Sequence, residues 1–312
     1  MKRVIFYMEP EWAFGSIHYT LCKYLYSYGF DCQLLPWNKS YTLEAMRELD
    51  AVTDLYVTTP HGWRLLGYSY RTVEPSKVVA MAHARIDYAD LIHHHGYGDF
   101  DKFRRFAAVT DYLIGVSKDV GINRIPEHVP IGINFHTFYT QPSERLNTVG
   151  YAGAYTPREG VSETDKDSFL TLPKHHKRSW LVKEAAERVG LEFKTADSYH
   201  RSFVSMAGFY KSVDAVVIAS TQEGAGLPAM EGGAAGKLII GTPVGHWESR
   251  IAPYGGDTVP LAEAEFMEKT VELLSYYKNN PAKYKARCLE IQHHAQSYDW
   301  KYVIDRWINL LS

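Results

Sequence analysis

The chain has 312 residues, which is long for one hydrophobic core and suits two domains of about 150 residues each. Its 46% hydrophobic content and near-balanced charge, 34 basic and 36 acidic residues, indicate a globular protein and give no support for general nucleic-acid binding. Three scattered cysteines indicate neither a disulfide framework nor a zinc site, and no span reaches transmembrane length, so a reducing, cytoplasmic location fits.

Strand and helix signals alternate at the start of the chain. Residues 4–7 predict a buried strand, and residues 17–28 predict a helix that Gly29 ends. Residues 30–35 predict a second strand, and this order favours a parallel sheet with helices on its faces. Ligands bind beyond the carboxyl ends of such strands, so we expect the loop at residues 8–16 to lie at the ligand-binding edge.

Two further predicted strands, residues 54–58 and 77–82, are each followed by a histidine, His61 and His83. An imidazole beyond a strand end can hydrogen-bond a ligand or stabilise developing charge. The alternative is a loop histidine with a purely structural hydrogen bond. We prefer this alternative for His61.

Two other clusters are interpreted without a ligand. Three adjacent histidines, residues 93–95, cannot easily converge on one ion, and no carboxylate or cysteine pattern completes a metal site. The basic cluster DFDKFRR, residues 99–105, is typical of an ordinary helix face. An anionic acceptor or a membrane surface is the alternative partner for it.

The later elements suit a second sheet. Residues 111–116 and 129–131 predict the last strands of the first domain, and the polar, proline-broken residues 141–143 predict the linker. The second domain is expected to begin with a strand at residues 148–152. The polar stretch at residues 158–174 predicts a mobile loop. Further elements are expected as helices at 179–189, 202–211, 263–277 and 281–298 and strands at 192–195 and 258–260.

The strongest signal lies in residues 213–245. An apolar run at 213–219 predicts a buried strand, a glycine-broken loop follows, and residues 229–236 predict a helix. Pro228 suits the first helical position, and residues 238–242 predict the next strand. The loop therefore opens onto a helix N-terminus, where free amides and the helix dipole can hold a phosphate.

Two carboxylates frame this loop. Glu223 opens it, and Glu231 is expected in the first turn of the helix. Gly224 and Gly226 allow the backbone to approach a ligand closely. A carboxylate beside a phosphate is a strong acceptor for hydroxyl groups, so the pair indicates a ligand with phosphate and sugar, such as a sugar nucleotide. Taken singly, either glutamate could instead be a solvated residue or complement the dipole.

The sequence EGAGLPAME, residues 223–231, continued by GKLIIGTPVG, resembles the Glu–seven residues–Glu signature of retaining GT-B glycosyltransferases, especially the large family-four group. The resemblance implies an α/β protein with the GT-B fold, in which two Rossmann-like domains hold the donor in the cleft between them. It also implies transfer of a sugar from a nucleoside-diphosphate sugar with retained configuration, without an obligatory metal or other cofactor.

The resemblance gives expected roles to the residues of this loop. Glu223 is expected to contact donor-sugar hydroxyls as a catalytic residue, and Glu231 to bind the ribose. The remaining donor contacts are expected from the backbone amides of Gly224, Ala225, Gly226 and Leu227.

In the first domain, the resemblance concerns two places. His83 follows a central strand where the family has a histidine close to the donor sugar, so we include it among the catalytic candidates. Gly15 and Ser16 resemble the small-residue pair, usually Gly-Gly, that approaches the donor phosphate.

The cations depart from the family pattern. An arginine is expected after the strand at residues 148–152, but Ala154 stands there. Lys177 matches the family's lysine as a catalytic candidate, with Arg178 beside it for donor binding. Arg158 could replace the arginine, and the alternative for all three cations is a solvated surface.

The resemblance predicts residues 1–143 as the acceptor domain, residues 144–297 as the donor domain, and residues 298–312 as a tryptophan-bearing helix that crosses back to the first domain. A hexose linked to UDP or GDP is the expected donor, and a glycan or lipid is the favoured acceptor. A peripheral membrane contact is an alternative feature, and neither acceptor nor oligomeric state follows from the sequence.

Two other functions stay open. The first is a GT-B sugar-nucleotide epimerase, which acts without an acceptor. The second is a non-catalytic nucleotide-sugar-binding protein, for which the loss of the arginine at Ala154 is the best support.

Overall fold

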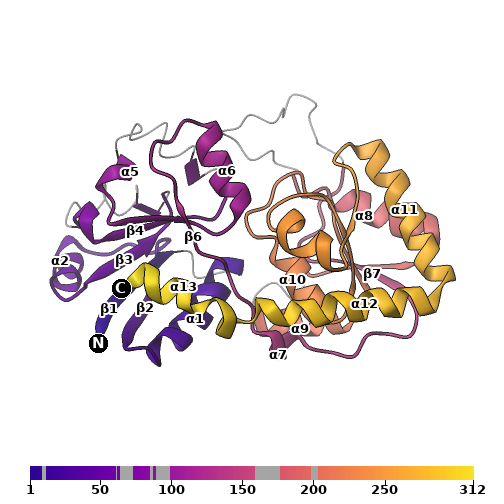
Figure 1. Ribbon diagram of the computed structural model, residues 1–312, viewed down its shortest axis with the longest axis horizontal. Helices are drawn as coiled ribbons and strands as arrows, with labels where there is room; N and C mark the ends of the chain where they lie inside the picture. Colours follow the sequence, from indigo (N-terminus) through magenta and orange to yellow (C-terminus); the bar gives the residue numbers. More distant parts are fainter. Residues whose placement is uncertain are drawn as a thin grey trace. The chain divides into compact units, whose positions relative to one another are not determined.

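A computed structural model of the chain describes residues 1–8, 12–60, 62–63, 73–84, 87–88, 99–158, 176–197 and 203–312 (Figure 1). His61, the histidines at 93–95 and the insertion beyond Arg158 lie outside these residues. The described residues form two compact units. The first comprises those up to Gly132 together with Trp300–Ser312, and the second comprises those between Ile133 and Asp299.

The described strands of the first unit form a parallel sheet in the order β2-β1-β3-β4-β5-β6. Apolar runs make its centre, since every residue of β3 and β4 is buried. The elements of this unit are β1 Lys2–Met8, α1 Trp12–Tyr26, β2 Phe30–Pro36, α2 Leu43–Ala51, β3 Leu55–Thr58, η1 Pro75–Lys77, β4 Val78–Ala82, α5 Asp99–Lys102, β5 Arg105–Ala108, α6 Asp111–Asp119, β6 Glu127–His128 and α13 Trp300–Leu311.

Several boundaries of the first unit differ from the sequence prediction. The stretch at 111–116, expected as a strand, lies in helix α6, because the Thr110 hydroxyl caps the helix by accepting the amide of Leu113. The strand is β5, which ends before it, and β6 ends before the predicted 129–131. Helix α1 begins at Trp12, so Gly15 and Ser16 lie within the helix rather than in the preceding loop.

Helix α13 packs with the first unit. It contacts α1, and the Trp307 indole donates to the carbonyl oxygen of Pro130 at 2.9 Å. The Lys2 ammonium donates to the carbonyl oxygens of Leu311 at 2.7 Å and Ser312 at 2.8 Å. The end of α13 is thereby attached to the first strand.

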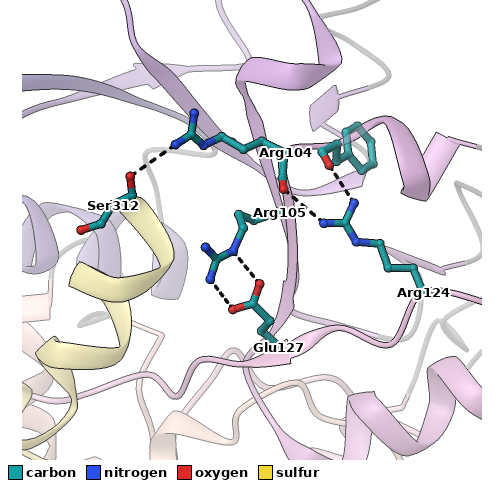
Figure 2. A network of polar contacts seen from close by, with 6 residues as sticks. Arg104, Arg105, Arg124, Glu127 and Ser312 are labelled. Carbon is teal, nitrogen blue, oxygen red and sulfur yellow. Dashed lines mark hydrogen bonds and ion pairs between the residues drawn. The ribbon is translucent and has the colours of Figure 1, made fainter.

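The arginines of the basic cluster make contacts within the same unit, as Figure 2 shows. Arg105 on β5 forms a two-pronged ion pair with Glu127 on β6, with both distances 2.6 Å. Arg124 donates to the carbonyl oxygens of Phe103 and Arg104, and Arg104 donates to that of Ser312. The described arginines of this cluster therefore connect strands β5 and β6 and helix α13.

The described strands of the second unit form another parallel sheet, in the order β11-β10-β9-β7-β8. Its elements are α7 Phe135–Phe138, β7 Thr148–Tyr151, α8 Ser179–Val189, β8 Glu192–Thr195, α9 Phe203–Lys211, β9 Ala215–Ile218, α10 Leu227–Ala234, β10 Leu238–Gly241, η2 Trp247–Ile251, η3 Ala252–Tyr254, β11 Asp257–Thr258, α11 Glu263–Asn279, α12 Pro281–Ala295 and η4 Gln296–Tyr298.

The strand order of this second sheet determines where a ligand can bind. From β7 the chain moves to β8 on one side and then returns to β9 on the other. Because such crossovers are right-handed, α8 covers one face and α9 and α10 cover the opposite face. The order reverses between β7 and β9, and ligands of open parallel sheets bind beyond the carboxyl ends at this point. The segments there are the residues after Tyr151 and those after Ile218.

Candidate functional site

The loop between β9 and α10 ends in an uncapped helix N-terminus. Gly226 stands at the N-cap position with φ of 70° and ψ of 43°, a left-handed conformation that favours glycine. The helix starts at Leu227, two residues earlier than expected, with Pro228 in its first turn. Glu231 is consequently in the second turn, and the expectation that it lies in the first turn is wrong. Pro228 has no amide hydrogen and the Ala229 amide donates to the carbonyl oxygen of Gly226 at 3.0 Å, so in this first turn the Leu227 amide is the one that can face an anion.

The turn after β10 packs against the backbone of this loop. Gly245 has φ of 62°, and a Cβ added there would lie 2.9 Å from the carbonyl oxygen of Gly224. The His246 amide donates to the carbonyl oxygen of Ala225 at 3.4 Å. The Thr242 hydroxyl donates to that of Ser220 at 2.6 Å. The end of the sequence motif, TPVG, and the residue after it thus support the shape of its first half through the Thr242 hydroxyl, the close approach of Gly245 and the His246 amide.

Lys177 and Glu223 form an ion pair at the start of the loop. The Lys177 ammonium lies 2.5 Å from Glu223 Oε1, and the Ser220 hydroxyl donates to the same oxygen at 2.6 Å. The Glu223 side chain is 13% exposed and that of Lys177 is 43% exposed. The Thr221 amide donates to the carbonyl oxygen of His176, which joins this loop to the segment that carries Lys177.

The charge of Glu223 is maintained despite its burial. Burial alone would raise the pKa of this carboxyl, but the Lys177 charge and the hydrogen bonds from Lys177 and Ser220 outweigh it, so the pKa is lowered. The site therefore presents an ionised carboxylate and an accessible ammonium side by side. The carboxylate can accept hydroxyl groups, and the ammonium can neutralise a phosphate.

Arg178, the next residue, points inward. It has φ of 46° and is 5% exposed. Its guanidinium donates to the carbonyl oxygens of Ala219 and Leu261, both at 2.5 Å, and lies over the Phe266 ring. These contacts hold the end of β9.

The two remaining positions of the expected cation set lie on the surface. Ala154 is exposed after β7. Arg158 is also exposed, and its guanidinium lies 3.5 Å from a carboxylate oxygen of Glu263 at the start of α11. Among the lysines and arginines that the structure describes, Lys177 is the one that forms an ion pair with a carboxylate of the loop between β9 and α10, that of Glu223.

Glu231 is buried inside the second unit. It is 9% exposed, and its Oε2 accepts a hydrogen bond from the Tyr210 hydroxyl at 2.8 Å. Burial raises the pKa of Glu231 to about 7, although the tyrosine hydrogen bond opposes this shift. Sequence reasoning did not single out Tyr210, because a tyrosine within a predicted helix carries no signal of its partner.

His83 follows β4 in the first unit and is buried. Its backbone amide and that of Ala84 donate to Asp87 at 2.7 Å and 2.8 Å. Its ring meets the His18 ring edge-on, with centroids 5.6 Å apart. Burial, aided by His18, lowers the pKa of His83 well below its ordinary value, so the imidazole is neutral near pH 7. Sequence reasoning missed His18, which lies one helical turn after Gly15.

The other first-unit candidates lie on α1, where Gly15 is buried and the side chain of Ser16 is outside the description. Within the described ranges, no group of three or more His, Cys, Asp or Glu side chains is arranged to hold a metal ion. A search of the same ranges finds no helix with the length and apolar character needed to span a membrane.

No protein-family model matches the sequence, and no curated protein matches it either. Solved structures do match in fold. Sucrose-phosphate synthase from Thermosynechococcus elongatus is 13% identical with a TM-score of 0.70, covering 99% of this chain and 98% of its own. HepE from Anabaena, in complex with UDP and glucose, is 12% identical with a TM-score of 0.65, covering 100% and 99%.

A third similar structure is the apo form of the lipopolysaccharide outer core galactosyltransferase WaaB, at 12% identity and a TM-score of 0.64, covering 99% of both chains. These structures match nearly the whole chain in fold. The chain therefore has the GT-B fold, an α/β architecture of two Rossmann-like domains.

Proposed function

We propose that this chain is a retaining glycosyltransferase of the family-four type, which transfers a hexose from a UDP- or GDP-linked donor to a hydroxyl group of a glycan, lipid or other acceptor. The observation that carries the proposal is the Lys177–Glu223 pair beside the N-terminus of α10. This arrangement combines a hydroxyl acceptor, a cation and free amides at the point where the strand order of the sheet reverses. HepE, of the same fold, is seen with UDP and glucose, which supports the donor class.

Each group has a role in this reaction. The amides of Gly224–Leu227 hold the sugar and phosphate, and Glu223 orients the sugar through its hydroxyl groups. Lys177 offsets the charge that develops on the departing diphosphate, which serves in place of a metal ion. Glu231 accepts the ribose hydroxyls. No side chain acts as a nucleophile, and the leaving phosphate accepts the proton of the acceptor hydroxyl.

The first unit is proposed as the acceptor domain. His83 is neutral, so it would serve the donor sugar as a hydrogen-bonding group rather than as a cation. Gly15 and Ser16 on α1 are proposed to approach the donor phosphate, and helix dipoles favour anions at such N-terminal turns.

A second candidate is a non-catalytic nucleotide-sugar-binding protein. Ala154 offers no charge, and Arg178 is committed to two backbone carbonyls. Both observations leave the diphosphate with fewer cations than the family pattern supplies. Such a site would hold a donor without stabilising its departure.

The test has two stages. Thermal-shift measurements with UDP, GDP and ADP and with their sugars identify the nucleotide, and donor turnover is then measured with and without glycan and lipid extracts. Transfer to an acceptor with the α or β configuration of the donor retained, read by NMR and insensitive to EDTA, supports the proposal. Binding without turnover supports the second candidate, and an acceptor-independent isomer indicates an epimerase.

A further inference from the structure

Tyr210 is a buried tyrosine for which sequence and fold assign no function. It lies on α9, is 0% exposed, and packs edge-on against the Phe138 ring of α7 with centroids 5.7 Å apart. Its hydroxyl donates to Glu231 Oε2 at 2.8 Å. Both residues are buried, Glu231 being 9% exposed, so this hydrogen bond helps to define where the carboxyl group points.

We propose that Tyr210 is a positioning residue of the nucleotide site, which fixes the Glu231 carboxylate by occupying one of its oxygens and so reserves the other for a ribose hydroxyl. The inference rests on the proposed function, because it needs a nucleotide at Glu231. A tyrosine hydroxyl has one proton to donate, and a carboxylate has two oxygens that accept. One donor from α9 therefore orients the group without filling its capacity.

Rigid support distinguishes this hydrogen bond from a chance contact. Phe138 and Phe209 flank the Tyr210 ring at 5.7 Å and 5.3 Å between centroids, so the ring cannot turn away without opening the core. Helix α10, which carries Glu231, contacts α7 as well. A freely rotating glutamate would lose side-chain entropy on binding a ribose, whereas a fixed one has already lost it.

The same contact links nucleotide binding to pH. Burial raises the pKa of Glu231 to about 7, and the Tyr210 hydrogen bond favours the ionised form. Among the described residues, Tyr210 is the titratable side chain that touches this carboxyl, and no charged group of α7, α12, β9 or β10 contributes to its shift. A ribose hydroxyl donates most strongly to the ionised carboxylate, so binding should release a proton below pH 7.

Affinity measurements from pH 6 to pH 9 test the inference. UDP-glucose and GDP-mannose are suitable probes, because their diphosphate diesters do not titrate in this range. We expect the unmodified chain to bind about tenfold more weakly at pH 6 than at pH 9, since one carboxyl becomes protonated. Tyr210→Phe should bind about tenfold more weakly at pH 7, lose less at pH 9, and shift the pH profile upward. Glu231→Gln should bind weakly with a flat profile.

Tyr284→Phe is the matched control. Tyr284 is another fully buried tyrosine of the second unit, and its hydroxyl donates to the carbonyl oxygen of Asp214 at 3.1 Å, before β9. We expect Tyr284→Phe to lower the melting temperature as much as Tyr210→Phe does, and to leave the pH profile of nucleotide-sugar binding unchanged. If the unmodified chain binds a nucleotide sugar and Tyr210→Phe binds it with the same affinity and the same pH profile, the inference about Tyr210 is overturned and the proposed function is not. Failure of the unmodified chain to bind any nucleotide sugar overturns the proposed function, and the inference falls with it.

Discussion

The two sheets end in polar groups of opposite kinds. Beyond β9 of the second unit, the Glu223 carboxyl stays ionised despite its burial, because Lys177 and Ser220 lower its pKa. Beyond β4 of the first unit, His83 faces His18, and burial keeps it uncharged near pH 7. Pairing preserves charge where burial alone removes it. The edge of the second sheet is therefore suited to bind a charged ligand, and the edge of the first sheet to make neutral hydrogen bonds.

The strongest way to break this comparison is to remove the charge of Glu223. We expect Glu223→Gln to lower the rate of sugar transfer about 100-fold or more, because an amide is a weaker acceptor and no longer balances Lys177. Steady-state kinetics with the identified donor measures the loss, and the melting temperature should change little. Glu184→Gln, at an exposed ion pair with Arg188 on α8, is the matched control and should retain full activity.

The adjacent cations Lys177 and Arg178 should separate catalysis from stability. Lys177→Gln is expected to lower transfer about 10- to 100-fold with a smaller loss of stability than Arg178→Gln, since the lysine side chain is 43% exposed and Ser220 still donates to Glu223. Arg178→Gln should instead cost about 2–4 kcal/mol of unfolding free energy, because two carbonyl oxygens lose charged donors. Equal losses of stability in the two variants would contradict the distinct placements.

The contact under the loop predicts a smaller effect. Gly245→Ala would put a Cβ 2.9 Å from the Gly224 carbonyl oxygen, so the loop must shift, and we expect about tenfold weaker nucleotide binding. Gly121→Ala is the control, because Gly121 also has a positive φ, 72°, but open space around its added Cβ. Calorimetric titration should show a loss in the first variant and none in the second. Similar binding by both would mean that the loop does not depend on this contact.

Continuous apolar runs explain how much of the fold could be predicted. Strands such as β4 and β9 and helix α8 stand close to their expected bounds, because long apolar or periodic stretches have one stable arrangement in a layered α/β protein. The stretch that became α6 is short and apolar, so its period is ambiguous. The N-cap hydrogen bond of Thr110 favours the helix over a strand.

The site was predictable only where its residues are neighbours in sequence. The loop from Glu223 to Glu231 is a local motif, and its strand–loop–helix setting follows from the pattern. The partners of its two carboxylates, Lys177 and Tyr210, come from other elements, and their pairing depends on the fold. The sequence also does not show that Arg178 is buried while the adjacent Lys177 is partly exposed, because Arg178 has a left-handed backbone conformation that depends on the fold.

The smallest expected effect is a pH dependence of stability that comes from His83, the neutral histidine beyond β4 in the first unit. The folded chain holds His83 below its ordinary pKa, so the unfolded chain binds more protons as the pH falls through about 6.5. The stabilisation is complete above that pH and is lost below it, at up to about 1.4 kcal/mol per pH unit for one proton.

His83→Gln removes this titration, so its melting temperature should fall less steeply between pH 7 and pH 5 than that of the unmodified chain. His293→Gln, on the surface of α12, controls for the loss of a histidine as such, because it leaves the His83 environment unchanged. A His83→Gln variant that follows the unmodified curve over the whole range would show that folding does not lower the pKa of His83. His83 would then titrate in the folded chain as it does in the unfolded chain, and the contrast between the two sheets would be lost.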